Sequence, residues 1–284
     1  MNVGTYAVAQ LLRALPRGRI SRAVGRLAEL DLPPVVARAV VGLYAEAYRV
    51  DLGEAEAPAG AYPSFDAFFT RPLRPGARPC HAPPGAVVSP ADGRLDALGR
   101  IDRAGLVPVK GREYRVAELC GDEVAAERYH GGELAVIYLS PRDYHRVHAP
   151  VGGRVRVVRS LPGDFYPVNA IGERHVPRLL ARNRRVAAVI ELEGGGELTL
   201  VMVAAMIVGR ITLAPFAERD VPLGEHPLEP PFALERGAEL GVFHLGSTVV
   251  LLQTPGAPPF VRALGAIRVG DPLTESVARQ ADGG

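Results

Sequence analysis

The chain has 284 residues, 48% of which are hydrophobic, and a formal net charge of only +2. This size and composition allow one large domain or two modest ones, and the small net charge gives no overall signal for nucleic-acid binding. The longest apolar run away from the termini, 200–208, is far shorter than the roughly 20 residues of a membrane-spanning helix.

Two residue counts restrict the chemistry further. The two cysteines, Cys80 and Cys120, lack a CxxC partner, so they define no disulfide framework and only weakly favour a reducing compartment. Lys110 is the single lysine, against 32 arginines. Enzymes that use pyridoxal phosphate hold it on a lysine, so only Lys110 could serve such a cofactor.

The first 50 residues are more basic than the chain as a whole, with seven arginines and three acids. Ser21 is expected to cap a helix through Leu30, and Pro33 and Pro34 are expected to open a second helix at about 35–48. Two ordinary helices packed on the protein body explain this pattern most simply. The alternative is an amphipathic, arginine-rich surface that rests on an anionic membrane.

The remaining sequence indicates a linker followed by a β-rich body. Residues 51–62 resemble a linker, which separates an N-terminal helical segment (1–60) from a β-rich domain (61–284). Ser64 predicts a short helix to Phe69. The predicted fold class is α+β, a mostly antiparallel β body with N-terminal amphipathic helices. A Pro/Glu-rich stretch predicts a loop at 217–240. Short Val, Ile and Leu runs predict strands at 134–139, 153–158, 186–192, 197–208 and 248–253.

A carboxylate stands in the turn-like stretch SPADGRL, residues 89–95. Asp92 precedes Gly93 there, a common turn pair in which the aspartate usually bonds only to its own backbone. A turn can also hold a carboxylate rigidly enough to orient a histidine. Both interpretations are compatible with the residues alone.

The densest stretch is YLSPRDYHRVHAP, residues 138–150. Its Ser-Pro-Arg-Asp start, from Ser140 to Asp143, predicts a short helical turn on which His145 and His148 would share one face. The two histidines could also be one core and one surface residue, or a metal-binding pair. Because no further Cys or His cluster has zinc-ligand spacing, we expect an acid–base role and no metal.

The third stretch, HLGSTVV, covers residues 244–250. Gly246 and Ser247 form a hairpin turn on the simplest interpretation. With Asp92 and His148, Ser247 could complete an Asp–His–Ser constellation. The glycine positions that flank the serine of an α/β-hydrolase elbow are occupied by other residues here, which makes that kind of hydrolase an awkward fit.

Taken together, these stretches resemble the phosphatidylserine decarboxylase family in its proenzyme form. Each stretch is a weak signal alone, but the ordered set is specific and spans nearly the whole chain. The LGST sequence is similar to the bacterial, pyruvoyl-dependent branch. The matching stretches, in order, are FDAFFTRPLRPGARP, SPADG, YLSPRDYHRVHAPVGG, LPGDFYPVN, LLARNRRV, VMVAAMIVGRI and LGSTVV.

The resemblance implies that the protein cleaves its own peptide bond between Gly246 and Ser247. Residues 1–246 would form a large subunit and 247–284 a small one. Ser247 would become a covalent pyruvoyl group, which serves as cofactor and Schiff-base centre in place of pyridoxal phosphate. No metal is implied, and Lys110 is expected at the surface.

The resemblance also implies a role for each candidate side chain. His148 would activate Ser247 for self-cleavage, and Asp92 would orient His148. His145 would deliver the proton that follows decarboxylation. Since Gly246 has no Cβ, it could take strained dihedrals that let the serine hydroxyl approach the Gly246 carbonyl.

The implied reaction makes the protein a carboxy-lyase that condenses its pyruvoyl group with the amine of phosphatidylserine and releases CO2 and phosphatidylethanolamine. Because this substrate stays in a bilayer, the resemblance implies a peripheral protein on the cytoplasmic side of the cell membrane. The N-terminal helices would rest on the anionic lipid surface. The expected partners are the two subunits of one precursor, with a homodimer as one option and no nucleic acid.

Two other functions remain compatible with the residues. The first is an unprocessed serine hydrolase that uses Asp92, His148 and Ser247. The second is a non-enzymatic β module whose LGST stretch is only a turn and whose basic helices bind membranes. Chain cleavage distinguishes the decarboxylase from both.

Overall fold

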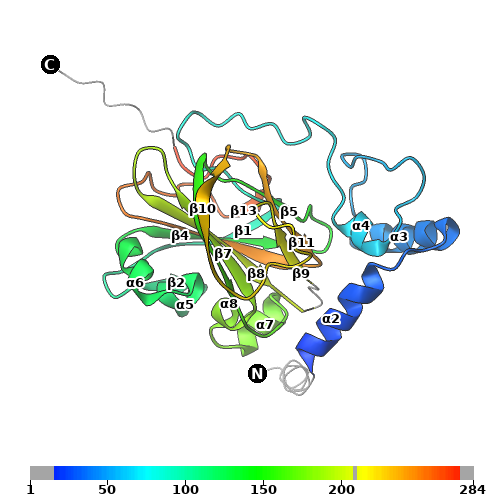
Figure 1. Cartoon of the computed structure of the whole chain (residues 1–284), viewed down its shortest axis with the longest axis horizontal. Coiled ribbons are helices and arrows are strands. Elements are labelled where there is room, and N and C mark those ends of the chain that lie inside the picture. The colour runs from blue at the N-terminus through cyan, green and yellow to red at the C-terminus, as the bar shows by residue number, and fades with distance from the viewer. Residues whose placement is uncertain (1–15, 207–209, 276–284) are drawn as a thin grey trace.

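An eight-stranded antiparallel sheet forms the centre of the molecule (Figure 1). The computed structural model describes residues 16–206 and 210–275. The strand order across this sheet is β10-β6-β7-β8-β12-β4-β1-β13. In chain order its strands are β1 (Gly93–Arg100), β4 (Glu133–Leu139), β6 (Gly153–Leu161), β7 (Arg185–Glu191), β8 (Glu197–Ala204), β10 (Gly224–Leu234), β12 (Ser247–Gln253) and β13 (Gly265–Ile267).

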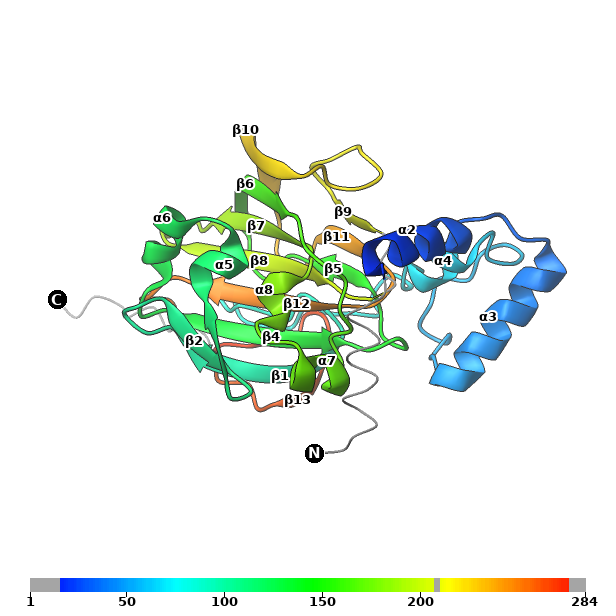
Figure 2. The same ribbon diagram turned by 90° about the horizontal axis from the view of Figure 1, so that it is seen from below.

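Different layers cover the two faces of this central sheet (Figure 2). A three-stranded sheet packs on one face, in the order β5 (Arg146–His148), β11 (Glu239–His244) and β9 (Arg210–Leu213). The other face carries the hairpin of β2 (Leu106–Val109) and β3 (Arg112–Arg115) together with short helices. These helices are α5 (Val116–Cys120), α6 (Glu123–Ala126), η1 (Glu127–Tyr129), α7 (Ala170–His175) and α8 (Leu179–Arg182).

Strand β12 is buried along its whole length because it lies in the middle of these layers. Its side chains alternate between two hydrophobic cores. Val249 packs in the core that contains Phe243 of β11, whereas Val250 and Leu252 pack in the core that contains Leu119 of α5. A strand with two buried faces has a nearly continuous apolar sequence, which explains the STVVLLQ run.

The structure confirms the α+β prediction and most of the predicted strands. The runs 134–139, 153–158, 186–192 and 248–253 fall on β4, β6, β7 and β12. The run 197–208 gives the shorter strand β8, and 207–209 lie outside the described residues. The loop prediction for 217–240 was wrong, because this stretch supplies β10 and the start of β11.

The N-terminal helices α2 (Arg17–Ala28), α3 (Pro34–Tyr48) and α4 (Phe65–Phe69) gather at one side of the body, next to β5, β9 and β11 (Figure 2). Ser21 lies inside α2 and does not cap it, so that prediction placed the helix start five residues too late. The predictions for α3 and α4 are confirmed. The Ser64 hydroxyl accepts a hydrogen bond from the Ala67 amide at 3.1 Å and caps α4.

Buried ion pairs attach these helices to the β body. Arg17 of α2 donates from Nε to Asp164 at 2.7 Å, and its side chain is only 8% exposed. Glu29, which follows α2, accepts from Nε of Arg210 on β9 at 2.6 Å. None of the helices within the described residues is long and apolar enough to cross a bilayer.

Candidate active site

Ser247 is the first residue of the central strand β12, at the point where the chain passes from the three-stranded sheet into the eight-stranded sheet. Its backbone pairs with Leu139 of β4 on one side and with Ala204 of β8 on the other. Strand alternation puts the Ser247 side chain on the same face as Val249, toward the three-stranded sheet. The residue is 1% exposed, and its hydroxyl has no hydrogen-bond partner among residues 16–206 and 210–275.

The turn before Ser247 is strained, but at a different residue from the predicted one. Leu245 has a φ of 83°, a left-handed conformation that is an outlier for a branched side chain, whereas Gly246 has no positive φ. Leu245 keeps this conformation because its side chain is buried in a cluster with Phe69 of α4 and Ala28 of α2. Packing by the N-terminal helices therefore holds a strained backbone one residue from the predicted scissile bond.

His145 lies in the segment that leads into β5 and is completely buried. Its Nδ1 is 2.8 Å from the Asp143 carbonyl oxygen, and its ring stacks on Phe69 with a centroid separation of 4.1 Å. Burial, and to a smaller extent the charge of Arg71, lower the pKa of His145 to about 3. The ring is therefore neutral near pH 7, with Nδ1 donating and a buried Nε2 that has no partner.

His148 ends β5, and protein groups hold both of its ring nitrogens. Nδ1 is 2.8 Å from the Gly237 carbonyl oxygen, and Nε2 is 3.1 Å from the Tyr144 hydroxyl. Since a carbonyl only accepts, Nδ1 carries the proton and Nε2 is the acceptor. This is the tautomer that a general base requires, although Tyr144 occupies its lone pair.

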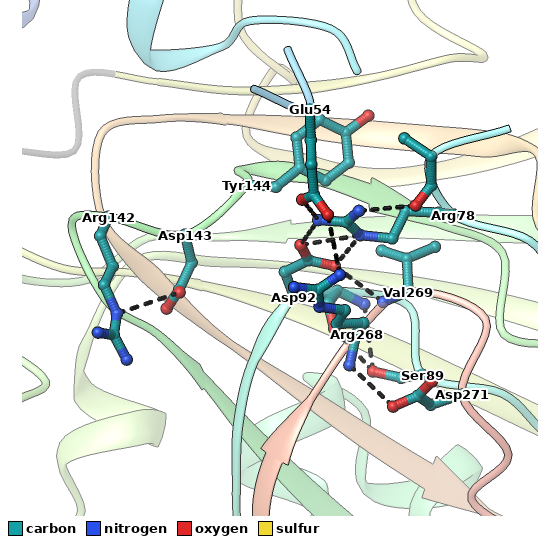
Figure 3. Close-up of polar contacts among 12 residues, drawn as sticks. Glu54, Arg78, Ser89, Asp92, Arg142, Asp143, Tyr144, Arg268, Val269 and Asp271 are labelled. Carbon is teal, nitrogen blue, oxygen red and sulfur yellow. Dashed lines mark hydrogen bonds and ion pairs between the residues drawn. The ribbon is translucent and has the colours of Figure 1, made fainter. Parts of the chain in front are cut away.

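Asp92 stands at the start of β1 and binds an arginine (Figure 3). Its carboxylate accepts from Nε of Arg78 at 2.9 Å and from the Val269 amide at 2.9 Å. Gly93 is required after it, because a Cβ there would lie 2.2 Å from the Tyr138 carbonyl oxygen. The close approach of β1 to β4 therefore explains why a glycine follows Asp92 in this stretch.

The predicted residues lie on neighbouring segments of the structure, which backbone hydrogen bonds hold side by side. The His148 amide donates to the Pro90 carbonyl at 2.7 Å, which places β5 beside the Asp92 turn. The Phe243 amide donates to the His145 carbonyl at 3.0 Å, which places His145 beside the end of β11. Across residues 16–206 and 210–275, no hydrogen bond links Asp92 to His148 or either histidine to Ser247. Their roles stay predictions.

The predicted helical turn at Ser140 was wrong. The Asp143 carboxylate does bond back to the Ser140 amide and hydroxyl, both at 2.7 Å, but the segment forms a non-helical turn that leads into a strand. His145 and His148 therefore do not share a helix face. The nearby Pro150 and the pairing of β5 with β11 favour extended backbone here.

His244 anchors the strand end before Ser247, a role that the sequence did not predict. Its Nδ1 is 2.9 Å from both carboxylate oxygens of Asp66 in α4, and Asp66 also accepts from Arg210 at 3.0 Å. These contacts anchor the end of β11, three residues before Ser247, to the N-terminal helices. No local pattern could predict the pair, because 178 positions separate its members.

The structure also allows Ser247 and Lys110 to be compared as residues that could carry a covalent cofactor. Ser247 has a buried hydroxyl without a partner, which fits a residue that is converted in place and does not need its hydroxyl for the fold. Lys110 is 30% exposed and pairs with Asp96 at 2.7 Å and Glu173 at 2.5 Å. A lysine held in two ion pairs is poorly suited to carry a Schiff base.

Comparison with known proteins gives one consistent result. A family model described as phosphatidylserine decarboxylase matches residues 65–275. A phosphatidylserine decarboxylase proenzyme of Anaeromyxobacter sp. (strain K) is 40% identical over 277 residues, which cover 92% of this chain and 95% of the relative. Proenzymes of the same name are 40% identical in Myxococcus xanthus, covering 90% and 91%, and 43% identical in Azotobacter vinelandii, covering 84% and 86%.

The lowered pKa of His145 predicts how the free energy of unfolding depends on pH. The folded-state pKa of His145, about 3, lies below the ordinary value of 6.5, so the unfolded chain binds a proton that the folded chain rejects. This contribution lowers the free energy of unfolding as pH falls from about 6.5 toward 3, by up to about 1.4 kcal/mol per pH unit. We expect His145→Gln to flatten the dependence of the thermal midpoint on pH between 6.5 and 4. Equal slopes for both proteins would contradict the buried neutral ring.

Proposed function

Because the chain belongs to the phosphatidylserine decarboxylase family, we propose that it is a proenzyme that cleaves itself before Ser247 and then converts phosphatidylserine to phosphatidylethanolamine and CO2. The observation that carries this proposal is the position of Ser247. The Ser247 hydroxyl is buried and has no hydrogen-bond partner within the described residues. The residue follows a strained turn at the corner between two sheets. A serine placed there cannot serve external substrates in the uncut chain, but the Gly246 carbonyl is covalently adjacent.

Self-cleavage requires three chemical steps at this corner. The Ser247 oxygen attacks the Gly246 carbonyl carbon and the amide nitrogen leaves, which gives an ester and a free amine. Loss of the Ser247 α-proton and of the Gly246 carboxylate then leaves dehydroalanine. Its imine form reacts with water to give a ketone and ammonia. The strain at Leu245 and the fixed start of β12 favour the first step, because they limit the positions of the reacting atoms.

We assign the base for the first step to His148, whose Nε2 is the acceptor nitrogen. Serine is a poor nucleophile without an adjacent base, so His148 must exchange Tyr144 for the Ser247 hydroxyl. Asp92 supports this step from the neighbouring turn, where Arg78 and Val269 fix its carboxylate (Figure 3). Gly237 keeps the His148 tautomer correct throughout.

In the mature protein, residue 247 would hold the pyruvoyl group at the start of β12, where its ketone supplies an acceptor for the electron pair released with CO2. We assign the subsequent proton delivery to His145. Its depressed pKa means that it must first gain a proton, and a nearby anionic substrate favours that gain. The completely buried ring also excludes competing water from the proton path.

Membrane binding through α2 and α3 is part of this proposal. Arg19, Arg22 and Arg26 are exposed on α2, where they can contact anionic lipid, whereas Arg17 is engaged by Asp164. Isolated exposed apolar residues are common, but a dense set on two adjacent helices indicates an interaction surface. The exposed apolar residues of this segment are Ile20, Leu27, Leu30, Val35, Val36, Val40, Leu43 and Tyr48. We infer a peripheral location on the cytoplasmic face of the cell membrane.

The first test is the intact mass of denatured wild-type and Ser247→Ala protein. We expect wild type to give fragments 1–246 and 247–284, the smaller one lighter by one ammonia than its unmodified sequence. Ser247→Ala should remain full-length and inactive, because it lacks the attacking hydroxyl. A full-length mass from active wild-type protein would instead favour the unprocessed hydrolase, and cleavage of Ser247→Ala would exclude attack by the serine.

The two histidines should separate cleavage from turnover. We expect His148→Ala to stay uncut over hours, since the proposed base is absent. His145→Ala should still self-cleave but lose about 100-fold or more in decarboxylation rate, the usual contribution of a proton-transfer group. Fragment masses and CO2 release measure the two effects. Normal turnover by His145→Ala would remove it from the site.

Sedimentation with anionic vesicles tests the membrane surface. Arg13 lies outside the described residues and Arg17 is structural, so the variant changes Arg19, Arg22 and Arg26 to Gln. We expect weaker vesicle binding at low salt and intact self-cleavage, because each arginine near a lipid surface contributes about 1 kcal/mol. The matched control changes Arg100, Arg103 and Arg154, three exposed arginines of the β body. Equal binding by both triple variants would refute the assignment.

A further inference from the structure

A cavity of about 450 Å³ lies beside the candidate site, where residues at the end of α3, β1 and β13 meet. Asp143 and Tyr144 form part of its wall. The Asp143 carbonyl bonds to His145, and the Tyr144 hydroxyl bonds to His148. A ligand in this cavity would therefore be separated from both histidines by a single layer of residues.

Arg71 lines this cavity and is a buried cation without a counter-ion. The residue is 4% exposed, and its guanidinium lies over the Phe68 ring at 5.4 Å from the centroid. Among the described residues, its Nε has no hydrogen-bond partner and its Nη2 donates to the Arg142 carbonyl at 3.3 Å. Within the described parts of the chain, no carboxylate forms an ion pair with it. Burial lowers the pKa of Arg71. A buried charge without an ion pair lowers the stability of the folded protein, which indicates that a bound anion would stabilise Arg71.

The acids around the cavity are bound to other groups, and Asp92 and Asp143 act on Arg71 only through their charges, without an ion pair. Figure 3 shows Arg78 between Asp92 and Glu54. The remaining acids are bound by polar or cationic groups of the protein: Asp143 by Ser140, Asp271 by Arg262, and Asp51 by the Gly53 amide. Among the described arginines that line the cavity, Arg71 is the buried one, and it forms no ion pair with these acids.

We propose that Arg71 binds the phosphodiester of the phospholipid headgroup, which enters this cavity from the membrane side. This inference rests on the proposed function, since the ligand is the headgroup of that substrate. A guanidinium presents several N–H donors in a fixed plane, which matches an oxyanion well. Arg49, the residue after α3, lines the same cavity, so the cavity lies beside a helix that is proposed to contact lipid.

The reaction itself favours the phosphodiester over the serine carboxylate as the ligand. Decarboxylation disperses the carboxylate charge, so an arginine on that group would stabilise the reactant more than the transition state and slow the step. The phosphodiester keeps its charge from substrate to product. Binding it holds the substrate without opposing the chemistry.

Arg71 is also close enough to His145 to influence its protonation. Phe69, two residues before Arg71, stacks on His145, and Arg146 donates to the Thr70 carbonyl at 2.8 Å. The charge of Arg71 contributes to the lowered pKa of His145. A phosphodiester on Arg71 offsets that charge, so substrate binding would make His145 easier to protonate when a proton is needed.

The test compares wild type, Arg71→Gln and Arg71→Lys on phosphatidylserine in mixed micelles of a non-ionic detergent. Such micelles reduce membrane-surface electrostatics, so that KM reports on headgroup binding. We expect Arg71→Gln to raise KM about tenfold or more while kcat changes less than about threefold, the effect of losing one charge-assisted contact. Arg71→Lys keeps the charge without the planar fork and should recover part of the loss.

Arg103→Gln is the matched control, because it removes the same charge from an exposed position in the turn after β1. Its KM should equal that of wild type. An unchanged KM in cleaved Arg71→Gln, or a fall in kcat alone, overturns the proposal while leaving the proposed function intact. Absence of cleavage and CO2 release in wild type would overturn the function itself.

A binding measurement covers the case in which Arg71→Gln does not fold. In uncut Ser247→Ala protein, which cannot react with amines, we expect glycerophosphoethanolamine at millimolar concentration to raise the thermal midpoint. Free serine has a carboxylate but no phosphodiester and should have no effect. An equal shift with inorganic phosphate would assign the site to a free anion, and a shift with serine alone would assign it to the carboxylate. Either result, or no shift at all, contradicts the proposal.

Discussion

The pairing of β12 on both edges is the constraint on which the rest of the structure depends. Because β4 and β8 bond to it from opposite sides, the position of Ser247 is fixed by two registers at once. One core covers each face of the strand, so neither a shift along the strand nor a rotation is open to it. Ser247 thus stands at a position held from both sides, two residues after the left-handed backbone of Leu245.

The N-terminal helices contribute to this rigidity as well as to a membrane surface. Asp66 and Phe69 of α4 hold His244 and Leu245, the two residues that precede Gly246. The same helical unit is tied to the β body through Arg17 and Arg210. The segment proposed to contact lipid and the corner proposed to break are therefore parts of one packed cluster. The simpler interpretation, helices packed on the body, and the membrane interpretation are not exclusive.

The sequence predicted features that depend on local patterns. Apolar runs predicted most strands, Ser64 predicted a helix cap, and the ordered motifs indicated the family. Features that depend on distant partners were not predictable: the Asp66 contact with His244, the Arg78 contact with Asp92, and the strain at Leu245. The helical turn at Ser140 was mispredicted because pairing of β5 with β11 overrides a local capping signal. The extra strand β10 was missed because its many prolines resemble a loop.

The location of the corner has a consequence for quality control in the cell. Residues 245 and 246 belong to neither sheet, so the proposed break after Gly246 falls between the paired segments of β11 and β12. In the proposed cleavage, the small fragment would stay in place as the central strand β12. Conversely, the serine reaches its reactive setting only after distant strands have closed around it. Under the proposed function, a chain that fails to complete the sheet would never form the pyruvoyl group, so misfolded copies would be inactive from the start.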